Sequence, residues 1–449
     1  MELWFGRTGP KLHESTAGGV HARALRLSGR VIRTGSTCPC RSVSILGSIT
    51  SVTIESLGGE PTSGVRTVEI VSRMTRLPRT TTLAAATPPL LALLGLGLHV
   101  RRNLGARPAE LRRLAESSPN AVGGVFANTE PGLPRAEASA RMLVNMLRSR
   151  VGEGAPPGPV PLARPEVPAE PAGLAVTWLG HAGALLEVDG RRVLVDPVWS
   201  EYASPVPFVG PRRLHPPVAP LSAVGDPDLV LLSHDHYDHL DRPTVSRLAR
   251  DSSAMFVGPI GVGAHLRAWG VPGHRVVERD WDGVVQLDGL TLTCLETRHF
   301  SGRGLRRNTT QWAAWKVAGP DHAVYVGGDT GPSRVHVRTG AEHGPFDLTL
   351  LPVGAYADLW PDIHADPEQA VTAHRELGGR VMLPVHWATF NLGFHPWDEP
   401  VERARKAAAA QDVVLALPRP GQRVDLTGAR TAADARAAVP TEPWWPARR

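Results

Sequence analysis

Cysteine is almost absent from this chain of 449 residues, which holds three: Cys38, Cys40 and Cys294. Three cysteines cannot build a disulfide framework, and the pair Cys38 and Cys40 is too sparse for a zinc ribbon. Lysine is equally scarce, with three of the 49 cationic residues, which we attribute to coding bias and not to a binding site. The fold must therefore be stabilised by packing, and a bound metal would need ligands other than thiolates.

An excess of positive charge is also missing from most of the chain. The first 80 residues hold eleven Lys or Arg and five Asp or Glu, so they account for the whole net charge of +6. The other 369 residues hold 38 charges of each sign. Because a nucleic-acid-binding face is normally basic, this neutral body argues against a nucleic-acid partner.

The first hundred residues carry no catalytic motif. Residues 1–79 show no sustained helical or strand period, and we interpret them as disordered or as a mis-assigned start, since Met74 opens a better-formed N-terminus. Residues 80–100 are uncharged and reach the ~20 residues that a membrane-spanning helix needs, although Pro88 and Pro89 interrupt them. We expect a membrane anchor or a signal-like segment there, which makes the protein membrane-associated. The alternative is a hydrophobic helix in a soluble, cytoplasmic protein.

Two further segments flank the main domain that we expect. Residues 101–173 are predicted to be a helical segment followed by a linker: PAELRRLAES and AEASARMLVNMLRSRV have helical spacing, and residues 153–173 are rich in proline. Residues 429–449 are expected to be a tail. The sequence carries no signal of the oligomeric state.

Residues 174–428 alternate between strand-like and helix-like segments. Asp189-Gly190 lies between two alternating runs and predicts a hairpin turn. Further strands are predicted at PDLVLLSH, LTLTCLETRH, TQWAAWKVA, DHAVYVGGD, FDLTLLPVG and RVMLPVHW, and helices at RPTVSRLARDS and PEQAVTAHRELG. This order predicts an α/β fold of two sheets with outer helices, an αββα four-layer sandwich.

The most informative motif, H-x-H-x-D-H, follows the apolar run LVLL and comprises His234, His236, Asp238 and His239. In a turn after a strand, alternate residues project together, so His234 and His236 can reach one ion while Asp238 and His239 face a neighbouring position. Without a metal these groups would repel when protonated and be desolvated when neutral. Imidazole and carboxylate suit zinc and similar divalent ions.

One such cluster supplies at most half of the ligands of a two-metal site, so other strand ends must supply the rest. His299, Asp329 and His386 each follow an apolar run and are our candidates. A lone histidine at a strand end is more often a hydrogen-bonded core residue, and we interpret six others in that way: His265, His274, His322, His336, His343 and His374.

These motifs resemble the metallo-β-lactamase superfamily. The stretches TWLGHA, DPVWSEYASPVPFVGPRR, SHDHYDHLD, GGDTG, GPFDLTLLPVGAY, HADPEQAV and HWATF are closer to one branch, the N-acyl-phosphatidylethanolamine-hydrolysing phospholipase D family and its bacterial relatives. The resemblance covers residues 174–420, with a fainter echo at FANTEPG. It implies a metallo-β-lactamase sandwich that binds two divalent metal ions, with zinc as the default.

Carried over residue by residue, the resemblance implies two ligand sets. One metal would take His234, His236 and His299, the other Asp238, His239 and His386, and Asp329 would bridge them. A hydroxide between the ions would be the nucleophile, and Asp238 would orient it. The phospholipase has Gln-His-Trp where this chain has Arg298-His299-Phe300, which changes the neighbours of that ligand.

Four more residues match the family without belonging to either set. His364 would protonate a leaving group, or it is a helix-start histidine, since the following Asp366 and Pro367 predict a helix N-cap with proline at the first position. His181 is expected to support the metal ligands without binding metal. Tyr237 and Tyr356 would line the substrate cleft, or simply pack.

Three functions follow as hypotheses. The first is a dinuclear metal-dependent phosphodiesterase of phospholipase D type acting on a phospholipid such as an N-acyl-phosphatidylethanolamine, with residues 80–100 keeping it near lipid. The second is a lactonase or carboxylic esterase of the same fold on a soluble substrate. The third is a metal-binding protein without turnover, which the large ligand set disfavours because a structural site needs only four ligands.

Overall fold

The computed structural model describes residues 94–134, 144, 152–304 and 306–446, and two short strands, β1 (Arg26–Leu27) and β2 (Arg30–Val31). The chain divides into two compact units, Met1–Thr87 and Pro88–Arg449. In the first unit only the antiparallel pair of β1 and β2 is described. The expectations for the rest of residues 1–79, and for residues 80–93 of the hydrophobic segment, therefore lie outside the described residues.

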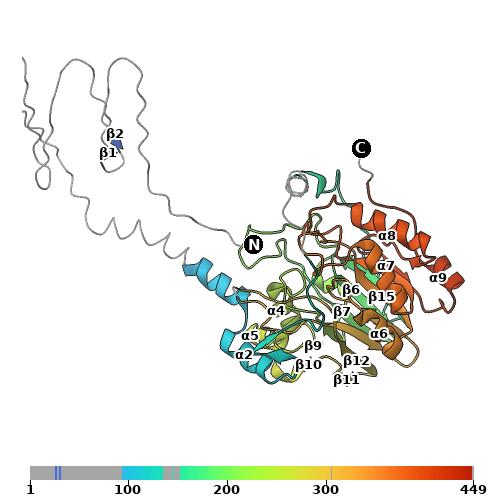
Figure 1. Ribbon diagram of the computed structural model, residues 1–449, viewed down its shortest axis with the longest axis horizontal. Coiled ribbons are helices and arrows are strands. Elements are labelled where there is room, and N and C mark those ends of the chain that lie inside the picture. The colour runs from blue at the N-terminus through green and yellow to red at the C-terminus, as the bar shows by residue number, and fades with distance from the viewer. Residues whose placement is uncertain are drawn as a thin grey trace, which may run out of the picture. The chain divides into compact units, whose positions relative to one another are not determined.

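Two seven-stranded sheets form the body of the second unit (Figure 1). The first has the order β10-β9-β8-β7-β6-β5-β18 and the second the order β11-β12-β13-β14-β15-β16-β17. The strands of the first sheet are β5 (Leu174–Gly180), β6 (Gly183–Val188), β7 (Arg191–Val195), β8 (Leu229–Leu231), β9 (Met255–Pro259), β10 (Val276–Arg279) and β18 (Arg423–Asp425). Those of the second are β11 (Val284–Leu287), β12 (Leu290–Leu295), β13 (Ala314–Ala318), β14 (Ala323–Val326), β15 (Phe346–Pro352), β16 (Gly379–Val385) and β17 (Val414–Leu415).

Strand pairing changes once from parallel to antiparallel within each sheet. From β7 to β10 and from β14 to β17 neighbouring strands are parallel, and the other pairs are antiparallel. Because parallel strands end at the same edge of a sheet, the loops that follow β7 and β8 lie together, as do those that follow β14 and β16.

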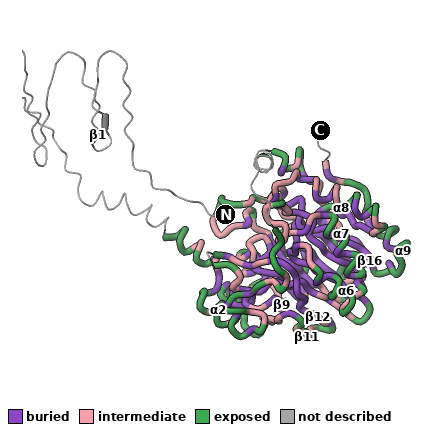
Figure 2. Tube along the Cα trace, viewed as in Figure 1, coloured by how far each residue is buried: buried purple, intermediate pink, exposed green. Residues whose placement is uncertain are grey.

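The core shows why the strands stack as two sheets with helices outside. Successive strand residues point to opposite faces: Val193 and Val195 belong to the large core shared by the sheets, whereas Leu194 belongs to the core that includes α4 (Arg242–Asp251) and α5 (Val262–Ala268). On the other side, α7 (Pro367–Glu376) packs on β15 and β16 and contacts α6 (Val335–His343) and α8 (Glu399–Ala410). Buried residues run through the strands (Figure 2). The predicted αββα sandwich is confirmed.

Local signals in the sequence account for several elements. Asp189 and Gly190 have φ angles of 45° and 79° and turn the chain between β6 and β7, as the type I′ hairpin pattern predicts. Predicted helices appear as α4, α7 and α2 (Pro108–Glu116). The second predicted helix before the linker lies outside the described residues except for Val144.

The prediction of a tail at residues 429–449 is wrong for the described part, which ends at residue 446. Helix α9 (Ala432–Ala438) starts with a capping box formed by Thr431 and Asp434, and Trp445 is 7% exposed, with its ring centroid 5.6 Å from that of Trp387. Burying aromatic side chains is strongly favourable, so this segment is part of the folded domain.

The stretch before β5 also packs on the sandwich. Residues 94–104 are helical, and we call residues 94–107 the N-terminal arm. The hairpin of β3 (Ala121–Val122) and β4 (Val125–Phe126) follows α2. Residues 154–173 of the Pro-rich linker form neither helix nor strand, but Val160 is buried and the Ala163 amide donates to the carbonyl of Pro420. Within the described residues, no helix combines the length and the apolar character needed to cross a membrane.

Candidate metal centre

The predicted metal ligands come from four strand ends, and the structure brings them together. His234 and its neighbours follow β8, His299 follows β12, Asp329 follows β14 and His386 follows β16 directly. The strands themselves are buried. The loops after them therefore meet at one end of the sandwich with their polar side chains converging.

The first group of candidate ligand atoms contains three histidines. Nδ1 of His236 lies 2.9 Å from Nε2 of His234 and 3.3 Å from Nε2 of His299. Oδ2 of Asp329 lies 3.8 Å from Nε2 of His234 and 3.5 Å from Nε2 of His299. All four atoms fall within 4.8 Å of one another, which is close enough for a single ion with bonds of about 2 Å to contact them after small adjustments.

The second group forms around Asp238. Its Oδ2 lies 3.3 Å from Nε2 of His386 and 3.5 Å from Nε2 of His239. Nε2 of His181, predicted to be a supporting residue, is nearer still, 2.8 Å from the same oxygen. His181 is therefore part of this group by distance, and its bond to Asp238 is the kind of contact that a supporting residue makes.

Asp329 touches both groups, as the prediction of a bridging residue requires. Besides the contacts of Oδ2 with the first group, the same oxygen lies 3.2 Å from Nε2 of His239. Its other oxygen, Oδ1, lies 3.2 Å from Nε2 of His386. A carboxylate with two oxygens facing two sets of imidazoles can coordinate two cations at once.

The far nitrogens of the rings show that the site fits a metal. His234, His239 and His299 donate Nδ1–H to Ser233 Oγ, Asp196 Oδ2 and the Ile363 carbonyl respectively, at 2.9, 2.9 and 3.1 Å. With Nδ1 bonded in this way, Nε2 of each ring is the atom that faces the centre and is left to bind a metal, as in metal-bound histidines. Nε2 of His239 and Oδ1 of Asp329 are buried without a hydrogen-bond partner. A divalent cation would supply the missing partner.

Burial and the neighbouring charges set the protonation of the ligand side chains. Burial lowers the pKa of His234 and His299 well below the ordinary value. Burial would also lower the pKa of His386, but Asp329 and Asp238 raise it to about 9. Burial would raise the pKa of both carboxyls, yet His239 above all holds them well below their usual range. Burial would lower the pKa of His239 too, but Asp329 and Asp238 raise it well above the ordinary value, so two protonated imidazoles face the two carboxylates, and bound cations would replace those protons.

Three side chains of the centre are partly exposed. The side chains of Asp238 and His364 are each 13% exposed and His236 is also partly exposed, whereas the side chains of His234, His239, His299, Asp329 and His386 are at most 2% exposed. Solvent therefore reaches the centre at Asp238, His364 and His236.

His364 lies at the rim of the centre, where it forms a third group of possible ligand atoms with Asp329 and His386, all within 4.8 Å of one another. Its Nδ1 is 3.9 Å from Oδ2 of Asp329, and burial lowers its pKa to about 4. Asp366, two residues later, caps α7 with its side chain and forms a capping box with Gln369. The N-cap predicted at Asp366 is confirmed, and His364 lies outside the helix with its Nδ1 towards Asp329.

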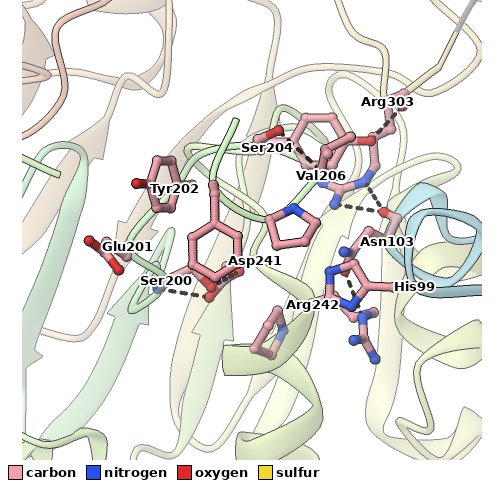
Figure 3. Close-up of a pocket in the computed structure, with 14 residues that line it drawn as sticks. His99, Asn103, Ser200, Glu201, Tyr202, Ser204, Val206, Asp241, Arg242 and Arg303 are labelled. Carbon is pink, nitrogen blue, oxygen red and sulfur yellow. Dashed lines mark hydrogen bonds between the residues drawn. The ribbon is translucent and has the colours of Figure 1, made fainter. Parts of the chain in front are cut away.

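The two tyrosines use their hydroxyl groups within the protein. Tyr237 donates to the carbonyl of Arg303 at 2.6 Å, and Tyr356 donates to Oε1 of Glu399 at 2.7 Å. Tyr237 is also among the residues that line a pocket of about 180 Å³, and Figure 3 shows this pocket with Asp241 and Arg303 in its lining. A substrate-binding role for their rings stays a prediction.

Sequence reasoning missed Asp196 and Asn128. Asp196 follows β7 and fixes His239, so the strand-end criterion that found the ligands would also have found it. Asn128, in the echo FANTEPG, bonds both the amide and the carbonyl of His299, at 3.0 and 2.9 Å. The two residues are 171 positions apart in the chain, and no spacing rule connects them.

Arg298, the departure from the family pattern, has a structural explanation. Its Nη2 donates to the Pro131 carbonyl at 2.5 Å, and its Nη1 to Glu130 at 3.3 Å and to the Pro332 carbonyl at 3.2 Å. The arginine thus ties the loop that carries Asn128 to the segment after Asp329.

Part of the backbone at the centre is held in an unfavourable conformation. His181, His386 and Ala388 have φ angles of 54°, 65° and 62°, a region that costs on the order of 1–3 kcal/mol for residues other than glycine. The amide of His386 donates to the carbonyl of His181 at 3.0 Å. The surrounding packing holds the two histidines in these positions against that cost.

Comparison with known proteins agrees with the site. The model of the beta-lactamase superfamily domain matches residues 191–387. An uncharacterized protein of Mycobacterium tuberculosis is 49% identical over 385 residues, 84% of this chain and 100% of that protein.

Two more distant relatives carry functional names. The N-acyl-phosphatidylethanolamine-hydrolyzing phospholipase D 1 of Caenorhabditis elegans is 36% identical over 234 residues, which cover 49% of this chain and 66% of that protein. A UPF0173 metal-dependent hydrolase of Methanopyrus kandleri is 29% identical over 222 residues, 48% of this chain and 85% of that protein.

Proposed function

Because the chain belongs to the metallo-β-lactamase superfamily of metal-dependent hydrolases, we propose that it is a dinuclear phosphodiesterase of phospholipase D type. Its proposed substrate is a phospholipid such as an N-acyl-phosphatidylethanolamine. The observation that carries the proposal is the position of Asp329, whose two oxygens reach both ligand groups. The similarity to the Caenorhabditis elegans enzyme supports the substrate class.

Seven side chains would hold the metal ions: His234, His236, His299, Asp238, His239, His386 and Asp329. Two divalent ions bound there would make water acidic enough to attack at neutral pH and would neutralise charge on a phosphoryl group. Zinc is the default, because five imidazoles and two carboxylates without a thiolate suit zinc but do not exclude iron or manganese.

Asp238 would orient the attacking water and accept its proton. It lies on the accessible side of the centre, and the Nε2–H of His181 holds its Oδ2 at 2.8 Å. Burial, followed by the nearby His386, lowers the pKa of His181 to about 3. His181 is therefore neutral at neutral pH and fixes Asp238 without taking a proton from water.

His364 would donate a proton to the oxygen of the departing alcohol. With a pKa of about 4 its ring is neutral before substrate binds. A phosphodiester anion beside the ring would raise that pKa, because a nearby negative charge favours the protonated form. His364 would thus be protonated when substrate is in place.

The proposal is tested with the purified full-length protein, with zinc or manganese added. Substrates are vesicles that contain N-acyl-phosphatidylethanolamine, a soluble aryl phosphodiester, an aliphatic lactone and a carboxylic ester. We expect metal-dependent release of the N-acylethanolamine, with oxygen-18 from labelled water appearing in the phosphatidic acid. Cleavage of the lactone or the ester without any phosphodiester cleavage would replace this proposal with the esterase hypothesis. Metal-loaded protein that turned over no substrate would favour the non-catalytic one.

A further inference from the structure

The side chain of Arg303 is buried and donates hydrogen bonds to main-chain carbonyls. Two of these carbonyls belong to residues 235–240, which we call the metal loop. Arg303 itself is 6% exposed. Its guanidinium lies 4.0 Å above the ring of Tyr237, and the Tyr237 hydroxyl donates to the Arg303 carbonyl. A buried guanidinium is costly unless its donors are satisfied, so the partners of those donors indicate what the residue does.

One nitrogen of this side chain spans the loop that carries the ligands. Nη1 donates to the carbonyl of Asp235 and to that of Leu240, each at 2.7 Å. The two hydrogens of Nη1 are thus both used. Between these carbonyls lie three of the candidate ligands, His236, Asp238 and His239.

The opposite edge of the guanidinium bonds the N-terminal arm. Nε and Nη2 donate to the carbonyl of Asn103 at 3.1 and 2.9 Å (Figure 3). The side chain of Asn103 makes different contacts, accepting from Nε of Arg242 at 2.7 Å and donating to the carbonyl of Pro205 at 3.0 Å. Arg303 thus links the arm to the loop at residues 235–240, and Arg242 links the arm to α4.

A second contact joins the arm to the same loop. Nδ1 of His265 accepts from the amide of Ala106 at 3.0 Å, so the neutral ring carries its proton on Nε2, which lies 3.5 Å from Oδ2 of Asp235. Oδ1 of Asp235 accepts from the amide of Gly302 at 2.7 Å. His265, which the sequence suggested was ordinary, therefore lies between the arm and the metal loop.

We propose that Arg303 is a positioning residue that sets the geometry of the metal ligands by clamping residues 235–240 to the N-terminal arm. The segment between the two carbonyls is a turn without strand partners, so main-chain carbonyls there need donors from elsewhere. Metal sites tolerate displacements of only about 0.5 Å. The proposal rests on the metal binding proposed above and adds that the arm is part of the site's support.

The test compares metal binding by full-length variants loaded with Co²⁺, using the visible absorption spectrum and chelator competition. In Arg303→Met we expect affinity to fall by ~10–100-fold, the usual effect of removing a group that supports metal ligands, and the cobalt bands to change. Arg303→Lys cannot bond the loop and the arm together, so we expect it to lose affinity too. The loss should be smaller than in Arg303→Met, because lysine keeps the charge. Arg242→Ala, the matched control, removes a bond from α4 to the Asn103 side chain but keeps the bonds of Arg303 to the arm and to residues 235–240, so it should bind like wild type.

The results of the cobalt-binding test would overturn different parts of the proposal. A folded Arg303→Met protein with wild-type affinity and spectrum would overturn the clamp; if that variant does not fold, the same result in Arg303→Lys would do so. An equal loss in Arg242→Ala would assign the effect to the arm in general and overturn the role of Arg303. Wild-type protein that bound no cobalt would overturn the proposed function itself, and the clamp with it.

Discussion

Nδ1 of His239 lies 2.9 Å from Oδ2 of Asp196, and neither side chain is exposed to solvent. The other oxygen of Asp196 accepts from the amide of Ser233 at 2.8 Å, so the carboxylate itself cannot turn. The pair fixes the ring of His239 with Nε2 towards the metal centre. A ligand group thus depends on a residue that does not reach the metals.

Replacing Asp196 should therefore weaken metal binding although no ligand is removed. We expect Asp196→Asn to lower zinc affinity by ~10–100-fold, because the amide gives His239 a weaker acceptor without charge. Chelator competition measures the change. The matched control is Asp189→Asn, which alters a partly buried Asp–His pair away from the centre, Oδ1 of Asp189 and Nδ1 of His322 at 2.6 Å, and should leave zinc affinity unchanged. Equal affinity in Asp196→Asn and wild type would contradict the role of Asp196.

Asp329 and His364 should respond differently to substitution. Asp329→Asn removes the charge shared by both ligand groups, so we expect metal content and turnover to fall together. His364→Ala should keep its metal and lose ~10²–10⁴-fold in turnover, the usual worth of a proton donor. Elemental analysis and rates on two aryl phosphodiesters give both quantities.

The leaving group provides the internal control for His364. An alcohol that departs easily needs little help from an acid, so the loss in His364→Ala should shrink on the more activated diester. Loss of metal in this variant would mean that His364 is a ligand. An unchanged rate on every substrate would mean that it takes no part in catalysis.

The C-terminal segment should contribute measurably to stability. Trp445 is buried against Trp387 and donates to Oε1 of Glu402 at 3.0 Å. We expect Trp445→Ala to lower the free energy of unfolding by about 3 kcal/mol, measured by urea titration of the circular dichroism signal. Arg436→Ala removes an exposed ion pair with Asp412 on the same segment and should cost less than about 1 kcal/mol. Similar stability of the two variants would contradict the packing role of Trp445.

Stability should fall as the solution becomes acidic, partly because of His374. Burial lowers its pKa from 6.5 to about 4, and its Nδ1 is bonded to Oγ1 of Thr349 at 2.8 Å. Between these values the unfolded chain binds a proton that the folded protein does not, so the stability present above pH 6.5 is lost as the pH falls towards 4.

His374→Gln should reduce this dependence by about 2 kcal/mol between about pH 7 and pH 5. Urea titrations of metal-saturated protein at both pH values measure it. The exposed His274→Gln is the control and should keep the wild-type dependence. An unchanged slope in His374→Gln would show that other groups carry the effect.

The strand-end criterion explains what the sequence could reveal about the site. His234, His299, Asp329 and His386 were found because titratable side chains are unexpected directly after buried strands. The layers of the fold followed from the order of strands and helices, which is local information. The packing of Trp445 was missed because a short helix and two tryptophans carry no period that marks them as core.

The supporting residues were harder to find for a physical reason. Arg303 bonds main-chain atoms 68 and 200 positions away in the chain, and Asn128 bonds the backbone of His299. Such contacts use groups that every residue has, so the sequence of the partner carries no trace of them. The absence of helix and strand from residues 154–173 was predictable from their prolines, but the hydrogen bond from Ala163 to Pro420 was not.

The bonds of Arg303 to main-chain carbonyls affect which positions of the sequence can vary within this family. Because Arg303 bonds the carbonyls of Asn103, Asp235 and Leu240, those bonds place no demand on which side chain stands at positions 103 or 240. Mutations there can accumulate over evolutionary time without breaking the clamp, as long as the backbone keeps its path. The arginine has no such freedom, since no other side chain offers five donors in a planar fork. Among relatives, the arm is thus expected to drift in sequence around a fixed arginine.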